Sequence, residues 1–510
     1  MLMEKRRAQP EIVFSRNYEE LPAWLLGGLD EVVFAASTGP DGGLTAIKHR
    51  PMHLTTNEPD VEFIDEDEDH SQQSPCRRAS LSTKSSPEAS EVEASSCLNE
   101  ISEWNNNHEN PSESAPELTA GIQGWNRPHP FAYGVSTTLY EKNPVTRINA
   151  GNPIADSYAI VARKNNAIMA LADGVNWGEK PSLAAKCAVH GCIDYLNKAL
   201  FPLRGAPLTT KDIFLALMRS MCAAHQLILL EEGDVTTLTV AVIVPMILPN
   251  KYAVCICNVG DSLAYVYNRQ TGVREITYGS HDINSMRNMR DALGALGPVD
   301  GISAPVLNNL TCSMTQVEPG DIVFLTSDGV SDNCDPVVGK FALPKEVKKK
   351  SGTRSKRKDI HPHAPQEDSL LHHAGLPVVE AFQRHELTMM RMDDLVSHGV
   401  GSQNHRLDSG RDITPQDLCH QLIDFATRLT NAKRRILEDP ELYEEEGAER
   451  EGPAEHHLED RSRRKRVSDR LAQLPGKLDH ATVVAYRVGV YHSDMEEEEE
   501  DFNAPLESPV

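Results

Sequence analysis

The sequence predicts an α+β fold, a four-layer αββα sandwich of two mainly antiparallel sheets flanked by helices. Strand-like segments outnumber helical ones along the chain. Most of them also follow one another without an intervening helix, which antiparallel sheets allow and parallel sheets do not. Two long helical segments come early and one comes late. These helices can cover the sheets.

The elements can be identified in order. Short β-branched or apolar runs bounded by turn residues predict strands, and apolar residues with a period of 3.6 predict helices. The predicted strands are SYAIVA (157–162), AIMALADG (167–174), TTLTVAVIVPM (236–246), KYAVCICNVGDSLAYVYN (251–268, two strands), GDIVFLTSDG (320–329) and HATVVAYRV (480–488). The predicted helices are SLAAKCAVHGCIDYLNKAL (182–200), KDIFLALMRSMCAAHQLILLEEG (211–233) and ITPQDLCHQLIDFATRLT (413–430), the last with Thr414 and Pro415 at its start.

The 510 residues suggest one folded core with polar additions. Residues 57–120 contain DEDED and a serine-rich stretch, a composition that cannot offset the cost of ordering. We therefore expect residues 1–125 to be mostly disordered, with a short apolar arm or helix at 11–36. The folded domain is predicted over 126–490. A polar insert at about 340–410 and a charged linker at about 438–475 are predicted to interrupt this domain. An acidic, disordered tail is predicted at 491–510.

Composition excludes several classes of protein. A net charge of −24 argues against a nucleic-acid partner, because phosphate backbones bind basic surfaces. We expect no membrane span, since the longest apolar run, 237–248, is shorter than the about 20 residues that a bilayer needs. The ten cysteines form no CxxC pair, so reduced thiols are expected rather than a zinc or disulfide framework. The basic N-terminus precedes no apolar stretch typical of a secretory signal. We expect a cytoplasmic or nuclear monomer.

Two basic clusters lie in the polar blocks, at 345–358 and 461–466. Runs of like charge are usually solvated, so these clusters are interpreted as parts of linkers. The alternative is that they are nuclear-localisation signals.

Five aspartates stand at the ends of predicted strands: Asp156, Asp173, Asp261, Asp328 and Asp479. Each could belong to an ordinary turn, because Asp-Gly and Gly-Asp are common turn dipeptides. Carboxylates that converge repel one another unless a cation lies among them, and oxygen ligands select hard ions such as Mg²⁺ or Mn²⁺. Two such ions about 3.5–4 Å apart can generate a bridging hydroxide that attacks phosphorus in line.

Six segments stand in a characteristic order: IADSYAI, ALADGV, GDVTTLTVAV, CNVGDSLAYVY, EPGDIVFLTSDGVSDN and LDHATVVAYRV. The series resembles the motifs of the metal-dependent serine/threonine phosphatases (PPM, or type 2C, family). Each motif is weak alone, but six in this order, on strands and turns, are specific. The resemblance covers roughly residues 130–335 and 410–490. It implies a β-sandwich of two antiparallel sheets flanked by helix pairs.

The resemblance also implies metal ligands, by position. Asp173 matches the aspartate that bridges both metals in the family, and Gly174 offers its carbonyl to one of them. A glycine there lets the backbone approach an ion closely. Asp328 and Asp479 match the remaining ligands of the second ion. Two Mg²⁺ or Mn²⁺ ions per domain are therefore expected.

Further roles follow from the same resemblance. Asp156 matches the aspartate that holds a metal-bound water, and Asp261 matches the carboxylate of a third, weaker metal in some members. Asp173 and Asp156 are thus candidate catalytic residues. His480 is a third candidate, because an imidazole beside Asp479 could give a proton to the leaving alkoxide. The alternative is that His480 caps the strand or stabilises Asp479.

The chain departs from the family pattern at several positions. Gly151 stands where the family often has an arginine that clamps the substrate phosphate, and its loss would weaken phosphate binding. Ala155 replaces the usual glutamate, Val175 replaces a histidine proposed as a general acid in some members, and His480 replaces an asparagine.

Two functions remain open. The first is a Mn²⁺- or Mg²⁺-dependent phosphatase that hydrolyses phosphoserine or phosphothreonine in proteins through a metal-bridging hydroxide. The second is a pseudophosphatase, the same fold used as a binding or scaffold module. Retained Asp173, Asp328 and Asp479 favour the enzyme, whereas Gly151 and Ala155 favour the scaffold. Either function implies a phosphoprotein substrate or a protein partner.

Overall fold

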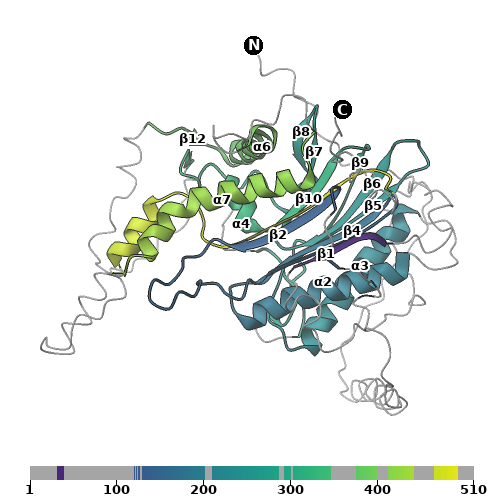
Figure 1. Cartoon of the computed structure of the whole chain (residues 1–510), viewed down its shortest axis with the longest axis horizontal. Helices are drawn as coiled ribbons and strands as arrows, with labels where there is room; N and C mark the ends of the chain where they lie inside the picture. The colour runs from purple at the N-terminus through teal and green to yellow at the C-terminus, as the bar shows by residue number, and fades with distance from the viewer. Residues whose placement is uncertain are drawn as a thin grey trace, which may run out of the picture. The chain divides into compact units, whose positions relative to one another are not determined.

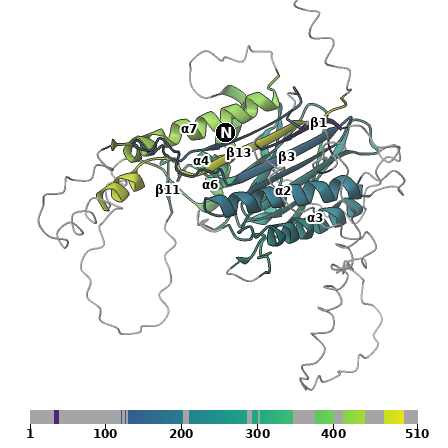
Figure 2. The same ribbon diagram turned by 60° about the horizontal axis from the view of Figure 1, so that its bottom comes forward.

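The structure, a computed structural model, describes residues 32–38, 120, 122, 125–126, 129–200, 209–285, 292–299, 303–345, 375–399, 412–440 and 465–491. These residues form two antiparallel sheets that pack face to face, with helices on the outer face of each sheet (Figures 1 and 2). The predicted four-layer αββα sandwich is confirmed.

The first sheet has the strand order β1-β3-β4-β5-β6-β9, and every neighbouring pair is antiparallel. Its strands are β1 (Val32–Ser37), β3 (Asp156–Arg163), β4 (Ala167–Asp173), β5 (Leu238–Pro245), β6 (Tyr252–Val259) and β9 (Thr311–Val317). Every residue of β3, β5 and β6 is buried. Helices cover one face of this sheet and the second sheet covers the other, which explains why these strands are nearly continuous apolar runs.

The second sheet has the order β2-β13-β10-β7-β8 and is also antiparallel. Its strands are β2 (Ala132–Thr138), β7 (Leu263–Asn268), β8 (Gly272–Glu275), β10 (Ile322–Thr326) and β13 (His480–Arg487). The last strand of the chain, β13, thus lies between β2 and β10. A separate two-residue parallel pair joins β11 (Leu343–Pro344) to β12 (Val378–Val379).

Two sets of helices form the outer layers (Figure 1). Helices α2 (Glu179–Leu200) and α3 (Thr210–Leu230) lie side by side on the first sheet. Helices α4 (Asp328–Cys334), α6 (Ala381–His398) and α7 (Pro415–Leu437) cover the second. Helix α7 begins where the sequence predicts: Thr414 caps it, Asp417 completes a capping box and Pro415 stands in its first turn.

Three apolar clusters fill the spaces between the layers. Ile193 and Leu217 belong to the cluster between α2, α3 and the first sheet. Met169 and Tyr486 lie in the cluster between the two sheets. Leu422 lies in the third cluster, between the second sheet and its helices. Each layer therefore buries its apolar face against the next, as a stable sandwich requires.

The structure contains strands and α-helices that the sequence did not predict, among them β2, β8, β9, β11, β12, α4 and α6. Helix α6 lies inside the predicted polar insert at about 340–410, where no helix was expected. Its buried residues include Arg384 and Thr388 as well as Met392, Leu395 and Val396. Arg384 pairs with the largely buried Asp335. A helix that buries polar residues has a weak apolar pattern, which explains why it was missed.

The predicted apolar arm ends in a strand and not in a helix. Its residues 32–37 form β1, the edge strand that pairs with β3. Residues 11–31 of the arm lie outside the described residues, as do the acidic and serine-rich stretch at 57–119 and the tail after residue 491.

Within the described part of the chain, one helix, α3, is long and apolar enough by length and composition alone to cross a membrane. Its residues Ile213, Leu217 and Leu227 are fully buried in the first core cluster. This packing is that of a core helix.

Candidate metal centre

The structure brings the strand-end aspartates of the first sheet together. Asp156 lies directly opposite Asp173 at the end of the β3–β4 ladder. The backbone N–H of Thr237 donates to the carbonyl oxygen of Asp173 at 2.8 Å, and the Thr237 hydroxyl accepts from the N–H of Asp173 at 3.1 Å. The same hydroxyl lies 2.9 Å from Oγ of Ser262, the residue after Asp261. Thr237 therefore braces the turn that carries Asp261 against the end of β4.

The second sheet contributes its aspartates at the same place. Asp328 is the first residue of α4, two residues after β10 ends, and Asp479 directly precedes β13, which pairs with β10. The two sheets meet where the N–H of Ala155 donates to Nδ1 of His480 at 3.4 Å. Two adjacent, twisted sheets thus present their aspartates at one common end.

Both glycines after the metal-site aspartates are required by packing. A Cβ on Gly329 would collide with the carbonyl oxygen of His480, so only glycine lets α4 begin beside β13. A Cβ on Gly174 would lie 2.5 Å from the carbonyl oxygen of Pro181 in α2. The sequence suggested that Gly174 frees a carbonyl for an ion. The structure gives a further reason, the close approach of the helix.

The aspartates perturb one another strongly. Burial raises the pKa of Asp173 well above its usual range, and the charges of Asp156, Asp328, Asp479 and Asp261 raise it further. Burial likewise raises the pKa of Asp328, with Asp261 and Asp479 adding to the rise. Mutual repulsion of this kind requires that the carboxylates lie close together. The predicted convergence of the five aspartates is therefore present in the fold.

Several buried carboxylate oxygens lack hydrogen-bond partners among the described residues. Those of the strand-end aspartates are Oδ1 and Oδ2 of Asp156 and Oδ1 of Asp328. Burial raises the pKa of Asp156, and nearby His480, Ser327 and Thr482 only partly oppose the rise. Buried carboxylates without donors are costly unless a cation compensates them, and an oxygen-only set fits a hard divalent ion. The donor set therefore fits Mg²⁺ or Mn²⁺.

A lysine that no sequence motif indicated lies in this cluster. The Lys477 ammonium contacts Oδ2 of Asp328, Oδ2 of Asp479 at 2.9 Å and Oδ2 of Asp332 at 3.1 Å. Burial alone would lower the pKa of Lys477, but Asp332, Asp328 and Asp479 raise it well above its ordinary value. A tethered cation thus contacts two of the predicted metal ligands.

The backbone of Lys477 is held in place. Asn333 of α4 accepts from the N–H of Lys477 at 2.8 Å and donates to its carbonyl oxygen at 3.0 Å. The preceding Gly476 has φ +89°, and a Cβ there would lie 2.7 Å from Cγ2 of Thr430. A glycine is favoured at this φ, so the turn that aims Lys477 at the aspartates is specified locally.

The position of the missing phosphate clamp is filled. Gly151 has φ +79°, and a Cβ there would collide with the ring of Tyr140 and lie 3.1 Å from Nε2 of His480. The Tyr140 hydroxyl donates to Oδ1 of Asp479 at 3.3 Å. An arginine at position 151 would have to displace both rings. Two arginines lie near position 151 in the sequence: Arg147 is exposed, and Arg163 is buried at the opposite end of β3 from Asp156.

Both ring nitrogens of His480 have partners in the fold. Nε2 lies 2.6 Å from the carbonyl oxygen of Gly151, and Nδ1 accepts from the N–H of Ala155. The ring is 1 % exposed. These contacts favour the alternative, in which His480 caps the strand, over the role of proton donor, and they add that the ring also holds Gly151 and Ala155 in place.

The metal-free protein is expected to lose stability as the pH rises toward neutrality. Asp173 and Asp328 have higher pKa values in the folded chain than the about 3.9 of an unfolded aspartate. A raised folded pKa contributes stability fully below the unfolded value, and this contribution is lost as the pH rises through the folded pKa. Tm measured in chelator from about pH 4 to about pH 8 should therefore fall. Saturating Mg²⁺ should reduce this slope, and an equal slope with and without Mg²⁺ would contradict the prediction.

Sequence comparison places the chain in a family. Residues 145–358 match the family model described as "Protein phosphatase 2C". The chain is also similar to "PP2C-like domain-containing protein CG9801" of Drosophila melanogaster, with 37 % identity over an alignment 633 positions long, gaps included. The alignment covers 94 % of this chain and 88 % of that protein. The chain belongs to the protein phosphatase 2C family. The resemblance of the six motifs is thereby confirmed.

Solved structures of low similarity accompany this assignment. The serine-threonine phosphatase 2C of Toxoplasma gondii is 11 % identical and covers 70 % of this chain and 95 % of its own, with a TM-score of 0.32. The Mycobacterium tuberculosis serine/threonine phosphatase PstP/Ppp is 13 % identical and covers 70 % of this chain and 100 % of its own, with a TM-score of 0.29. Membership of the protein phosphatase 2C family rests on the sequence relatives.

Proposed function

We propose that this protein phosphatase 2C domain is a metal-dependent enzyme that hydrolyses phosphoserine or phosphothreonine in proteins. The observation that supports the proposal is the convergence of five aspartates at one end of the sandwich, with buried oxygens of Asp156 and Asp328 left without hydrogen bonds among the described residues. A fold that brings repelling carboxylates together at a cost in stability is typical of a functional site.

The residues that would hold divalent ions are Asp173, Asp156, Asp328, Asp479 and Asp261, with the carbonyl of Gly174. When bound, such ions supply a nucleophile from water at neutral pH and neutralise charge on the phosphate. The chain positions its own carboxylates through neighbours: Thr237 holds the backbone of Asp173, and Tyr140 donates to Asp479. These contacts fix the donor set before an ion binds, which preorganises the site.

A scaffold function is the second candidate, and two observations favour it. Lys477 neutralises part of the charge that would attract an ion, because its ammonium contacts Asp328 and Asp479. The place of the phosphate clamp is occupied by Gly151 and by the rings of Tyr140 and His480. A site with fewer ions and without the clamp would bind phosphate more weakly than one with both.

Hydrolysis of a phosphothreonine peptide by the purified full-length chain in Mn²⁺ tests the proposal. We expect turnover that Asp328→Asn lowers about 100-fold or more, as when one electrostatic contributor to a transition state is removed. Asp424→Asn, on the outer surface of α7 in a pair with Arg428, is the matched control and should leave turnover unchanged.

The outcomes separate the two candidates. Turnover equal in Asp328→Asn and in the parent chain would overturn the enzyme assignment. Calorimetric Mn²⁺ binding that is lost in Asp328→Asn, without turnover in the parent, would instead support the scaffold.

A further inference from the structure

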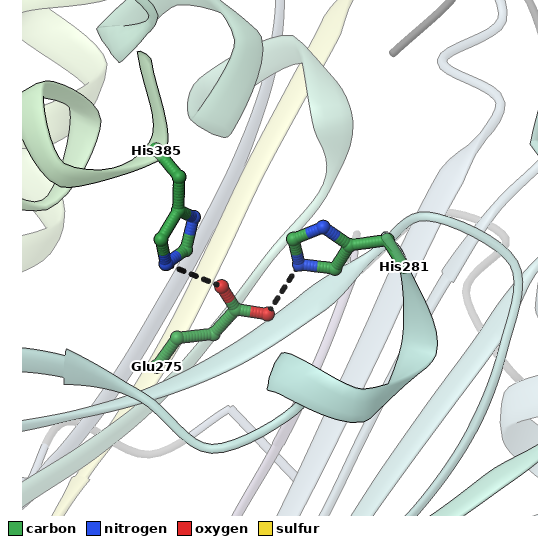
Figure 3. Close-up of side chains that lie close together, drawn as sticks. All are labelled: Glu275, His281 and His385. Atoms are coloured by element: carbon green, nitrogen blue, oxygen red, sulfur yellow. Dashed lines mark hydrogen bonds and ion pairs between the residues drawn. The ribbon is translucent and has the colours of Figure 1, made fainter. Parts of the chain in front are cut away.

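A second group of metal-binding side chains lies outside the aspartate cluster. Glu275 ends β8, His281 follows the 3₁₀ turn Tyr278–Ser280, and His385 lies near the start of α6 (Figure 3). Their ligand atoms, one from each residue, all lie within 4.8 Å of one another. Two neighbouring segments thus meet a helix that lies far from both in the sequence.

The geometry is close to that of a metal site. Nε2 of His281 lies 2.8 Å from Oε1 of Glu275, and Nε2 of His385 lies 3.7 Å from Oε2 (Figure 3). Ligand atoms on a tetrahedral ion with bonds of about 2.0–2.2 Å stand roughly 3.3–3.6 Å apart. Small movements of the side chains would bring both distances into that range.

The carboxylate at the centre is buried and incompletely satisfied. The Glu275 side chain is 2 % exposed. Oε1 accepts from the Thr277 hydroxyl at 3.0 Å and lies beside His281, whereas Oε2 has no hydrogen bond among the described residues. Burial alone would raise the pKa of Glu275, but His281, His385 and the Thr277 hydrogen bond lower it below its usual value. The group is therefore an ionised, buried acceptor.

The chemistry of the donors differs from that of the aspartate cluster. Imidazole nitrogens suit Zn²⁺, whereas oxygen-only sets suit Mg²⁺ or Mn²⁺. Burial lowers the pKa of His385, so its ring is neutral at physiological pH and able to coordinate. Two imidazoles and one carboxylate leave a fourth position for water, and His281 would coordinate through Nε2 with its ring proton on Nδ1.

We propose that Glu275, His281 and His385 form a zinc site that fastens α6 to the edge of the second sheet. This site is separate from the proposed catalytic centre and does not depend on its activity. Helix α6 already docks on β8 through Asp393, whose Oδ1 accepts from the N–H of Val273 at 3.2 Å. The ion would add a second attachment near the other end of the helix.

The zinc site also lies next to the turn of Asp261. Asn309 donates to the carbonyl oxygens of both Ser280 and Gly260, at 3.3 and 2.7 Å. Ser280 directly precedes His281, and Gly260 directly precedes Asp261. Fixing His281 therefore restrains one side of the aspartate cluster through a single side chain.

Zinc binding by the full-length chain, stripped with chelator and then held in excess Mg²⁺, tests the proposal. We expect one equivalent of tightly bound Zn²⁺ and, after Co²⁺ substitution, the intense visible absorption of a four-coordinate ion. His385→Ala should lower zinc affinity about 100-fold or more, since loss of even an outer partner of a ligand costs 10–100-fold. The matched control is His398→Ala on the same helix, a residue that is 76 % exposed and should leave binding unchanged.

A second variant locates the ion. Asp173→Asn removes a carboxylate from the aspartate cluster and should leave zinc stoichiometry and the Co²⁺ spectrum unchanged. Absence of stoichiometric Zn²⁺ in the parent chain would overturn the proposal. So would zinc that survives His385→Ala but is lost in Asp173→Asn, because the ion would then lie among the aspartates.

Discussion

Asp173→Asn is expected to abolish divalent-metal binding and phosphatase activity while making the metal-free chain more stable. The two effects have one cause. Asp173 is repelled by Asp156, Asp328, Asp479 and Asp261, and burial adds to the cost of its charge. A charge that burial and neighbouring carboxylates disfavour costs folding free energy at a pH at which the group is ionised. Removing the charge should therefore raise the free energy of unfolding in chelator at neutral pH.

Urea unfolding in chelator and calorimetry with Mn²⁺ measure the two effects in one preparation. Asp424→Asn, on the surface of α7, should change neither. A metal-free Asp173→Asn chain that is less stable than the parent would show that Asp173 makes favourable contacts that outweigh the repulsion. Proteins often give up stability to form a functional site. A variant that loses metal binding but gains stability without metal would identify such a site here.

Lys477→Ser is expected to increase the number or affinity of bound divalent ions. The ammonium contacts Asp328, Asp332 and Asp479, so it competes with an ion for the same charge. Two unit charges at 4 Å interact by about 4 kcal/mol at an effective dielectric constant of 20. Desolvation offsets part of this, and we expect a gain of about tenfold or more in Mn²⁺ affinity, measured by calorimetry. Phosphatase activity should rise if the binding of a divalent ion limits turnover.

The same substitution should destabilise the chain when no metal is present. Removing one partner of a buried ion pair typically costs about 3–5 kcal/mol, because the remaining charges are left uncompensated. Lys477→Arg keeps the charge and should retain the parent stoichiometry. Lys251→Ser, which removes a surface pair with Glu318, is the matched control. Unchanged Mn²⁺ affinity in Lys477→Ser would show that the lysine moves aside when an ion binds.

Lys477 links the two candidate functions, enzyme and scaffold. Lys477 gives the aspartates a cation of their own, which lowers the cost of the cluster in the absence of metal. A chain that folds without ions could act as a scaffold, and the same chain could act as an enzyme where metal displaces the lysine. We propose that the balance between Lys477 and the ions decides which of the two candidate functions applies.

Much of the fold could be predicted from the sequence because its core strands are local apolar runs. Segments such as 157–162 and 236–246 became β3 and β5, and Thr414–Pro415 marked the start of α7. Helix α6 could not be predicted in this way, because it buries Arg384 against Asp335, a pairing between residues 49 positions apart. The edge strand β1 likewise depends on its pairing with β3.

The family and the five aspartates could be recognised from the sequence, because each motif is a short local segment and each aspartate stands at the end of a strand. Tertiary structure alone decided what surrounds them. Lys477 directly precedes the motif LDHATVVAYRV, yet only the turn at Gly476 and the hydrogen bonds of Asn333 direct its ammonium to the aspartates. Nothing local indicates that His385 of α6 joins Glu275 and His281 either. Contacts between distant segments depend on how layers pack, and no period or spacing along the chain encodes that packing.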